Sequence, residues 1–335
     1  MLSYEGGRIL STYQDAKKLL RGEMVVPRMI SCWLTHVCNL NCDYCLYAWT
    51  HNQVKAFAPE DQFKKFIDEI ADAGVEGLEF AGGGESALHP KCFEFAEYAH
   101  LKGMRVGMIT NGTKFDFQRT VDHFAWIRFG IDAHVDELYQ KVKSVPSGMF
   151  DLVVKNAKEL IRVRGDKKTP RIGMKFLLGL KNYMYVRDMA YFAKECGMDY
   201  AHFKAEHNSH DEMPPGLRIT VQQTLLSMKD ELNGFVMGST DKLHAEVGCF
   251  MAPTHSVVNA YGDAFVCCYF NDPEKDSFGN YFKDGFKNVW FSEAHSRKQN
   301  SYTIAECDKY DCRWHAYNKQ FKDILVDNKM DLAFV

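Results

Sequence analysis

Three cysteines lie close together near the N-terminus, at Cys38, Cys42 and Cys45. Thiolates bind iron–sulfur clusters, and three of them on one loop can hold three irons of a cubane [4Fe–4S] cluster. No fourth cysteine follows at a comparable spacing, so the fourth iron of such a cluster would stay open to a substrate or cofactor. The spacing therefore predicts a reactive iron–sulfur centre rather than a purely structural one.

A zinc site, a disulfide framework and chance clustering are the alternatives for these three cysteines. A zinc site usually combines one C-x2-4-C pair with a second pair or with histidines, and closes at four ligands. A disulfide framework is typical of small secreted chains, whereas this chain has 335 residues. Chance clustering stays open because the chain has eleven cysteines.

The segments around the cysteine loop alternate short apolar runs with amphipathic stretches, which is typical of parallel strands joined by crossover helices. We expect strands at residues 29–34, 77–80, 105–109, 126–131, 171–177 and 199–204. We expect helices after Pro59 and at residues 90–102, 116–124, 151–164 and 185–195. Six such units predict an α/β fold, a partial (β/α)6 barrel of the TIM type.

Changes of pattern along the chain suggest its domain organisation. Residues 1–28 are expected to form a helical lead-in and residues 29–215 the partial barrel. A linker helix is expected within 216–244. A small cysteine-bearing α+β domain of short strands and turns would occupy 245–316, and a last helix and tail would occupy 317–335.

The C-x3-C-x2-C spacing, with the aromatic Tyr44 before the last cysteine, resembles the signature of the radical SAM superfamily. This resemblance implies that the open iron binds the amine and carboxylate of S-adenosylmethionine (SAM). It further implies that an electron from the cluster cleaves SAM to a 5′-deoxyadenosyl radical, which removes hydrogen from a substrate. An electron donor such as flavodoxin or ferredoxin would be a partner.

Glycine-rich and polar residues follow the expected strands, at the end where barrel enzymes place their sites. The run Ala-Gly-Gly-Gly-Glu-Ser resembles the family's GGE motif, which implies that Gly83, Gly84 and Glu85 meet the methionyl amine of SAM. A tight turn from strand to helix would also account for these glycines. The next strand ends at Asn111, which the resemblance places near the adenosyl group, although an Asn-Gly turn accounts for it equally well.

The fourth and later expected strands carry further candidates. The run Gly-Ile-Asp-Ala resembles a family motif in which serine stands at the place of Gly130, so one SAM contact of the family is missing here. Asp132 remains as an acceptor for a ribose or a substrate. Lys175 and Lys204 would point into the barrel or towards the carboxylate of SAM, or would lie on a solvated edge.

A second set of cysteines lies far downstream, at Cys249, Cys267, Cys307 and Cys312. A turn around Gly262 predicts a hairpin that brings the first two thiolates together, and the last two are spaced C-x4-C. The segment resembles the C-terminal SPASM/twitch extension of radical SAM enzymes. Four cysteines fit one auxiliary [4Fe–4S] cluster of the twitch type, and a four-cysteine zinc site is the alternative.

Four cysteines belong to neither set. Cys32, Cys92 and Cys196 are expected to be small buried hydrophobic residues. Cys268 is expected on a strand beside Cys267, with its side chain on the opposite face. It could donate a hydrogen atom to a substrate radical, replace Cys267 as a ligand, or simply pack in the core.

Composition argues against several functions. The net charge is −3, with 41 basic and 44 acidic residues fairly well mixed, which gives no electrostatic case for nucleic-acid binding. No apolar run approaches the ~18 residues of a membrane span. The N-terminus lacks the pattern of a signal peptide. We therefore expect a soluble cytoplasmic protein.

The combined pattern predicts a radical SAM enzyme of the oxidoreductase or epimerase class. We expect a polar small-molecule substrate (a sugar, an aminocyclitol or a nucleotide-like compound) and dehydrogenation or epimerisation, with elimination or loss of carbon dioxide as further outcomes. His202, Glu206 and His207 could bind its hydroxyls or assist deprotonation, or lie on the surface. The alternative is epimerisation or crosslinking of a ribosomally made peptide. A non-catalytic metal scaffold and a SAM-dependent methyl transferase are competing hypotheses.

Overall fold

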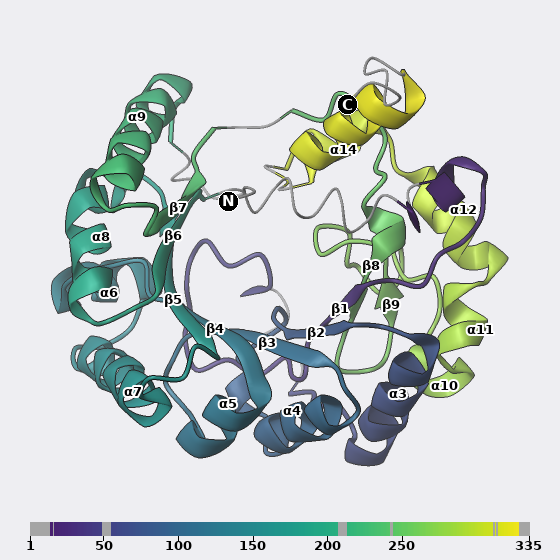
Figure 1. Ribbon diagram of the computed structural model, residues 1–335, viewed down its shortest axis with the longest axis horizontal. Coiled ribbons are helices and arrows are strands. Elements are labelled where there is room, and N and C mark those ends of the chain that lie inside the picture. Colours follow the sequence, from purple (N-terminus) through teal and green to yellow (C-terminus); the bar gives the residue numbers. More distant parts are fainter. Residues whose placement is uncertain are drawn as a thin grey trace.

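The computed structural model describes residues 14–15, 17–48, 55–206, 213–241, 244–310, 312 and 314–327. Its strands form one sheet that curves into an open barrel, with helices on the outside (Figure 1). The strand order is β7-β6-β5-β4-β3-β2-β1-β8-β9, and all neighbours are parallel except β8 and β9. The strands are β1 (Met29–Cys32), β2 (Gly77–Phe80), β3 (Arg105–Thr110), β4 (Phe124–Gly130), β5 (Arg171–Leu178), β6 (Tyr200–Ala205), β7 (Val236–Ser239), β8 (His255–Val258) and β9 (Ala264–Phe265).

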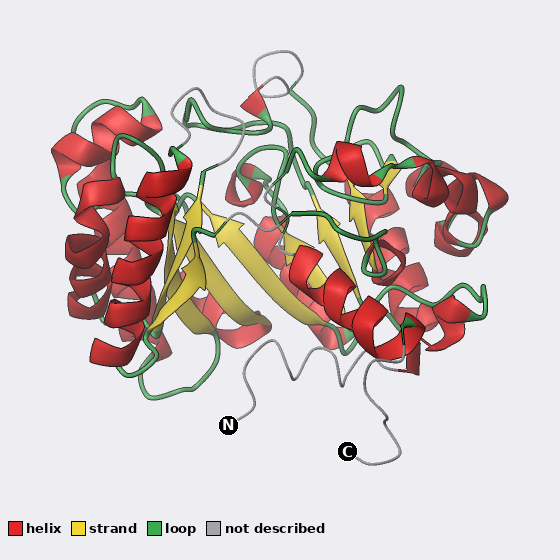
Figure 2. Ribbon diagram, turned by 90° about the horizontal axis from the view of Figure 1, so that it is seen from above, coloured by secondary structure: helices red, strands yellow, loops and turns green. Residues whose placement is uncertain are grey.

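Helices alternate with the first strands, as the sequence predicts. The barrel helices are α3 (Glu60–Ala73), α4 (Cys92–Leu101), α5 (Phe117–His123), α6 (Asp136–Lys143), α7 (Met149–Arg164), α8 (Val186–Glu195) and α9 (Pro215–Glu231). The apolar residues Phe63, Phe66, Ile67 and Ile70 of α3 are buried against the sheet at helical spacing. Figure 2 shows the strands in the middle of the molecule with helices around them. The prediction of a partial barrel is confirmed.

The two faces of the sheet have different chemistry. On β5, the alternate residues Ile172, Met174 and Phe176 are fully buried and belong to the core between sheet and helices. Because successive side chains point to opposite faces of a strand, Gly173 and Lys175 face the interior of the barrel. The interior face therefore carries the polar residues of β4, β5 and β6.

The sequence did not predict every element of the sheet. β7 lies within the expected linker and pairs with β6 as a seventh parallel barrel strand, while β8 pairs with β1 on the other side. Both are four residues long, and neither has a clear hydrophobic alternation. Helix α9 also begins earlier than expected, because Pro215 occupies its first turn, where a missing N–H costs nothing.

The C-terminal segment is continuous with the barrel sheet. The β8–β9 hairpin confirms the turn predicted around Gly262. Short helices follow where turns and strands were expected: α10 (Tyr281–Asp284), α11 (Phe286–Trp290), α12 (Glu293–Ser301) and α13 (Ile304–Cys307). The last helix, α14 (His315–Phe321), continues as a π-helical turn (Lys322–Val326).

Two long-range hydrogen bonds fasten this segment to the barrel. The buried Trp290 indole donates to the Val25 carbonyl at 2.8 Å, and the Phe286 N–H donates to the Glu69 carboxylate on α3 at 2.6 Å. The ring of Tyr281 stacks on Phe66 of α3 at 5.3 Å between centroids. These contacts attach residues 281–290 of the C-terminal segment to the barrel. The proposed domain boundaries themselves stay predictions.

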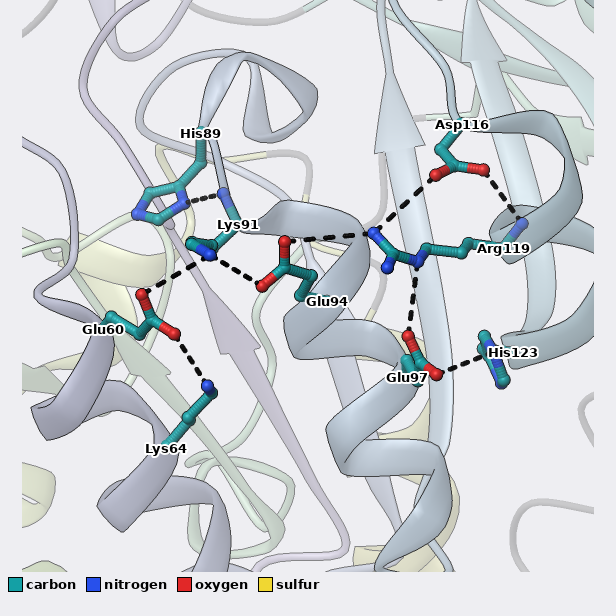
Figure 3. Close-up of polar contacts among 9 residues, drawn as sticks. All are labelled: Glu60, Lys64, His89, Lys91, Glu94, Glu97, Asp116, Arg119 and His123. Carbon is teal, nitrogen blue, oxygen red and sulfur yellow. Dashed lines mark hydrogen bonds and ion pairs between the residues drawn. The ribbon is translucent and has the colours of Figure 1, made fainter.

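A network of ion pairs joins successive helices on the outside of the barrel (Figure 3). Lys91 bridges Glu94 at 2.9 Å and Glu60 of α3 at 3.8 Å. Arg119 of α5 reaches Glu97 of α4 at 3.3 Å. These side chains are about one third exposed or more, so each pair adds little stability. The described helices include none with the length and apolar character needed to span a bilayer.

Candidate functional site

The first three cysteines lie on the loop that follows β1. Cys38, Cys42 and Cys45 are each partly buried, and none forms a disulfide. The backbone N–H of Leu40 points at the sulfur of Cys38, and that of Tyr47 at the sulfur of Cys45. Burial raises the pKa of Cys38 to about 12 and that of Cys45 to about 11, while these N–H donors oppose the shift. The donors suit sulfurs that carry negative charge, as cluster ligands do.

The glycine run after β2 packs directly on this loop. Gly84 donates its N–H to the Thr35 carbonyl at 2.8 Å. A Cβ on Gly84 would lie 2.2 Å from the Val37 carbonyl oxygen, and one on Gly83 would lie 2.9 Å from the Thr35 carbonyl oxygen. Both distances are too short for a real side chain, so glycine is required there for the close approach of two backbones. The run therefore fixes the position of the cysteine loop.

Glu85 connects the ends of two strands. Its buried carboxylate accepts hydrogen bonds from the Thr110 hydroxyl at 2.8 Å, the Asn111 N–H at 2.6 Å and the Ala87 N–H at 3.0 Å. Burial raises the pKa of Glu85, and these donors oppose the rise. The side chain of Asn111 donates to Asn39 of the cysteine loop at 2.8 Å. Contacts of Glu85 and Asn111 with SAM stay predictions.

A buried ion pair between Asp132 and Lys143 lies beside the cysteine loop. Only Asp132 was predicted as a site residue. The Asp132 carboxylate accepts from the Lys143 ammonium at 2.5 Å, from the Tyr44 hydroxyl, and from the Leu177 N–H at 2.5 Å. The Lys143 ammonium also reaches the Tyr44 oxygen at 2.6 Å. Their charges act on the Cys42 sulfur. This arrangement ties the aromatic residue of the cysteine motif to the end of β4.

Lys143 is a site residue that the sequence pattern did not predict. It lies on the buried side of α6, next to Leu138, Tyr139 and Val142. Burial by itself lowers the pKa of Lys143, but Asp132, Cys42 and Tyr139 together outweigh it and the net pKa is raised. A lysine on the apolar face of a short helix is the signal that could have identified it.

Lys175 faces the barrel interior, as one of its predicted orientations required. Burial and the positive charges of Lys204, Arg128 and Lys143 lower its pKa to about 8, while Asp132 acts in the opposite direction. Gly130 is its neighbour on β4. The predicted roles of Lys175 and Asp132 in binding SAM are not tested by this arrangement.

The second set of cysteines also gathers in space. The charge of Cys249 acts on both Cys307 and Cys312, and that of Cys312 acts on Cys267. Three of the sulfurs accept backbone N–H groups from residues two or three positions later in the chain: Cys249 from Ala252 at 3.3 Å, Cys267 from Tyr269 at 3.5 Å, and Cys312 from Trp314 at 3.4 Å. The Asn318 side chain adds a donor 3.6 Å from the Cys249 sulfur. These donors repeat the pattern of the first loop and fit an iron–sulfur centre.

No three described His, Cys, Asp or Glu side chains converge tightly enough to hold a single metal ion. A cubane cluster is larger than an ion and binds each thiolate to a different iron. The fit of both cysteine sets to clusters therefore rests on their proximity and on the N–H donors to their sulfurs.

One orientation predicted from the sequence is wrong. β9 ends at Phe265, so Cys267 and Cys268 lie in a turn and do not alternate across a strand. The two thiols form a hydrogen bond with each other. Cys268 also packs near Tyr47, which belongs to the first cysteine loop. It thus lies between the two cysteine sets rather than facing away from the second.

The remaining candidates are placed as follows. Cys32, Cys92 and Cys196 are buried, as expected. His202 lies on β6 on the same face as Lys204, and Glu206 is buried at the end of that strand. His207 lies outside the described residues.

Comparisons with known families agree with this geometry. The family model of the radical SAM superfamily matches residues 34–179, and that of the SPASM iron–sulfur cluster-binding domain matches residues 249–313. The chain belongs to the radical SAM superfamily. Members of this superfamily use a [4Fe–4S] cluster and SAM, and SPASM domains carry auxiliary iron–sulfur clusters. The predicted cofactors are therefore confirmed at the level of the family.

Curated radical SAM relatives act on different substrates. An AdoMet-dependent heme synthase of Methanosarcina barkeri is 42% identical over 87 residues, which are 26% of this chain and 25% of the relative. The antilisterial bacteriocin subtilosin biosynthesis protein AlbA of Bacillus subtilis is 24% identical over 282 residues, or 81% of this chain and 61% of AlbA. A SAM-dependent nucleotide dehydratase of Flammeovirga pacifica is 28% identical over 124 residues, or 35% of this chain and 42% of the relative. The chain thus spans between a quarter and about three fifths of these proteins.

Solved radical SAM structures share the fold. SuiB of Streptococcus suis bound to SAM superposes with a TM-score of 0.67 at 15% identity, covering 88% of this chain and 72% of SuiB. The enzyme anSMEcpe with bound AdoMet gives 0.65 at 17% identity, covering 88% of this chain and 89% of anSMEcpe. At these identities the likeness shows the fold alone.

Proposed function

We propose that this protein cleaves SAM reductively and removes a hydrogen atom from a substrate bound inside the barrel. The observation that carries the proposal is the attachment of the three-cysteine loop at the mouth of the barrel. The Gly83–Gly84 backbone holds the loop from one side, and the Tyr44–Asp132–Lys143 contacts hold it from the other. In this position the sulfurs of Cys42 and Cys45 lie within reach of the charge of Lys143, and that of Cys45 also within reach of Lys175 on the interior face.

The cysteines have separate roles in this proposal. Cys38, Cys42 and Cys45 would hold a [4Fe–4S] cluster with one open iron. Cys249, Cys267, Cys307 and Cys312 would hold one auxiliary [4Fe–4S] cluster. When bound, these groups together with SAM supply a 5′-deoxyadenosyl radical near the first loop and an electron acceptor near the second.

Residues of the chain would bind SAM and direct the outcome. Following the family motif, we assign Gly83, Gly84 and Glu85 to the methionyl end of SAM. In the same way we assign Tyr44, Asn111, Asp132 and Lys175 to the rest of the SAM molecule. Cys268 would decide between two outcomes. If its thiol returns a hydrogen atom to the substrate radical, the result is epimerisation and a thiyl radical is left on Cys268. If instead the substrate radical loses a proton and passes one electron to the auxiliary site, the result is net dehydrogenation.

A polar small molecule is the substrate that we propose. The interior face of the barrel carries the polar side chains of Arg128, Lys175, His202 and Lys204 above the rings of Trp126 and Tyr200. The alignment with nucleotide dehydratases supports a small substrate. Because the cysteines are all free thiols, we also propose a reducing, cytoplasmic location, with flavodoxin or ferredoxin as the electron donor.

The test is anaerobic reconstitution followed by counting of iron and sulfide. The wild type should bind about eight irons, and the C38A/C42A/C45A variant and the C249A/C267A/C307A/C312A variant about four each. C196A removes a cysteine outside both sets and is the matched control. With dithionite and SAM, only proteins with an intact first set should form 5′-deoxyadenosine. Absence of iron, or formation of S-adenosylhomocysteine instead, would contradict the proposal, and zinc at the second set would remove the auxiliary redox role.

Peptide modification is the second candidate function. AlbA aligns with 81% of this chain, and structures with the same fold include SuiB bound to its precursor peptide SuiA and anSMEcpe bound to a peptide. Incubation of the reconstituted protein with a candidate precursor peptide distinguishes the two. A change in peptide mass in ordinary water would favour the peptide. So would a mass increase that appears only in heavy water, because it reports incorporation of deuterium.

A further inference from the structure

Three cations face the barrel interior on three neighbouring strands: Arg128 on β4, Lys175 on β5 and Lys204 on β6. Arg128 is level with Gly173 of β5, and Lys204 is level with Leu177 of the same strand. Lys175 therefore lies one pleat above Arg128 and one pleat below Lys204. Measured along the strands, the Cα atoms of Arg128 and Lys204 are therefore four residues apart, or about 13 Å at the usual rise of a strand.

The lowest cation lies on an aromatic layer. The Arg128 guanidinium lies 5.4 Å from the Trp126 ring and 5.5 Å from the Tyr200 ring, and its Nε donates to the Tyr200 hydroxyl at 3.2 Å. These two rings fill the space next to Gly107 and Gly173, where a Cβ would lie 2.1 Å and 2.4 Å from ring atoms. The glycines thus make room for an aromatic layer beneath Arg128.

The middle cation has no counter-ion among the described residues. Within that part of the chain, no hydrogen bond or ion pair reaches the Lys175 ammonium. The nearby Asp132 carboxylate is already bound by Lys143, a tyrosine hydroxyl and a backbone N–H. The pKa of Lys175 is lowered to about 8 by burial and by the neighbouring cations. An anion placed among these cations would remove that repulsion.

The row of cations runs between the two cysteine sets. The charge of Lys175 acts on Cys45 of the first loop, and the charge of Lys204 acts on Cys312 of the second set. We propose that Arg128, Lys175 and Lys204 bind an anionic group of the substrate, a phosphate or a carboxylate, between the two sites. Lys175 is also a residue assigned above to SAM, and the test below separates an anion of the substrate from the SAM carboxylate. The proposal rests on the proposed function and names the substrate class for the same barrel.

The experiment measures anion binding by calorimetry on the reconstituted protein saturated with SAM. The probes are inorganic pyrophosphate for a phosphate group and tricarballylate for carboxylates. We expect at least one probe to bind, K175M to weaken it about tenfold or more, and K175R to restore it. K283M, which removes an exposed lysine of α10, is the matched control and should bind like the wild type.

Three results would overturn the inference: neither probe binds, K175M binds as well as K283M, or the wild type binds the probe only when SAM is left out. The third result would assign the cations to the SAM carboxylate. A protein that forms 5′-deoxyadenosine but binds no probe would refute this inference alone. A protein that binds the probe through Lys175 but never cleaves SAM would refute the proposed function and leave the anion site standing.

Discussion

Replacing Asp132 with asparagine should remove the charge that helps to hold the first cysteine loop against the barrel. The side chains of Asp132 and Lys143 are only 2% and 5% exposed, and their charged atoms are 2.5 Å apart. Asp132 has a positive φ of 55°, a conformation that asparagine tolerates as well as aspartate does. D132N therefore keeps the backbone and the oxygen that accepts from Leu177, and removes the negative charge.

The expected loss is about 3–5 kcal/mol in the free energy of unfolding, because removing one partner of a buried ion pair leaves the other charge unpaired. K143M removes that unpaired charge. The double variant D132N/K143M should therefore be more stable than the sum of the single effects predicts, by about 1–3 kcal/mol.

Urea unfolding of the cluster-free protein, followed by tryptophan fluorescence, measures these values. E159Q is the matched control, since it breaks an exposed pair with Arg162 and should change the free energy of unfolding little. The role of the buried ion pair is disproved if D132N costs no more than E159Q, or if the effects of D132N and K143M are additive.

Three further predictions concern other parts of the molecule. G84A should lower the iron content of the first site after reconstitution, because its Cβ would lie 2.2 Å from a carbonyl oxygen of the cysteine loop; unchanged iron would contradict this. Acidification from pH 7 to 4.5 should destabilise the wild type by about 2–3 kcal/mol more than H295F in urea unfolding. Burial lowers the pKa of His295 to about 4, so between pH 7 and 4.5 the imidazole is protonated in the unfolded chain but largely neutral in the folded chain. Equal pH profiles of the wild type and H295F would contradict the prediction. N318D keeps the oxygen that accepts from Phe250 but loses the donor to the Cys249 sulfur. The reduction potential of the auxiliary site should therefore fall in an EPR-monitored titration. An unchanged or higher potential would count against this.

The barrel strands could be predicted well because their signals are local. Buried strands such as β2 and β5 read as short apolar runs between turns, and α3 shows its apolar residues at helical spacing. The cysteine motifs are also local, since their spacing alone suggests the metal chemistry. Segments with weak local signals were missed, above all β7 and β8, which are strands only because they pair with β6 and β1.

Residue types and their spacing were enough to predict iron–sulfur and SAM chemistry. The signals were the two cysteine sets, the glycine run and the strands of a barrel whose ends bring them together. The partners of these residues could be known only from the folded chain. Folding placed Lys143 on Asp132 and turned the thiol of Cys268 towards that of Cys267. It also aligned Arg128, Lys175 and Lys204 along one interior wall. Metal-ligand spacing is a property of neighbouring residues, so it is visible in the sequence. Charge pairing and burial depend instead on which distant strands and helices pack together.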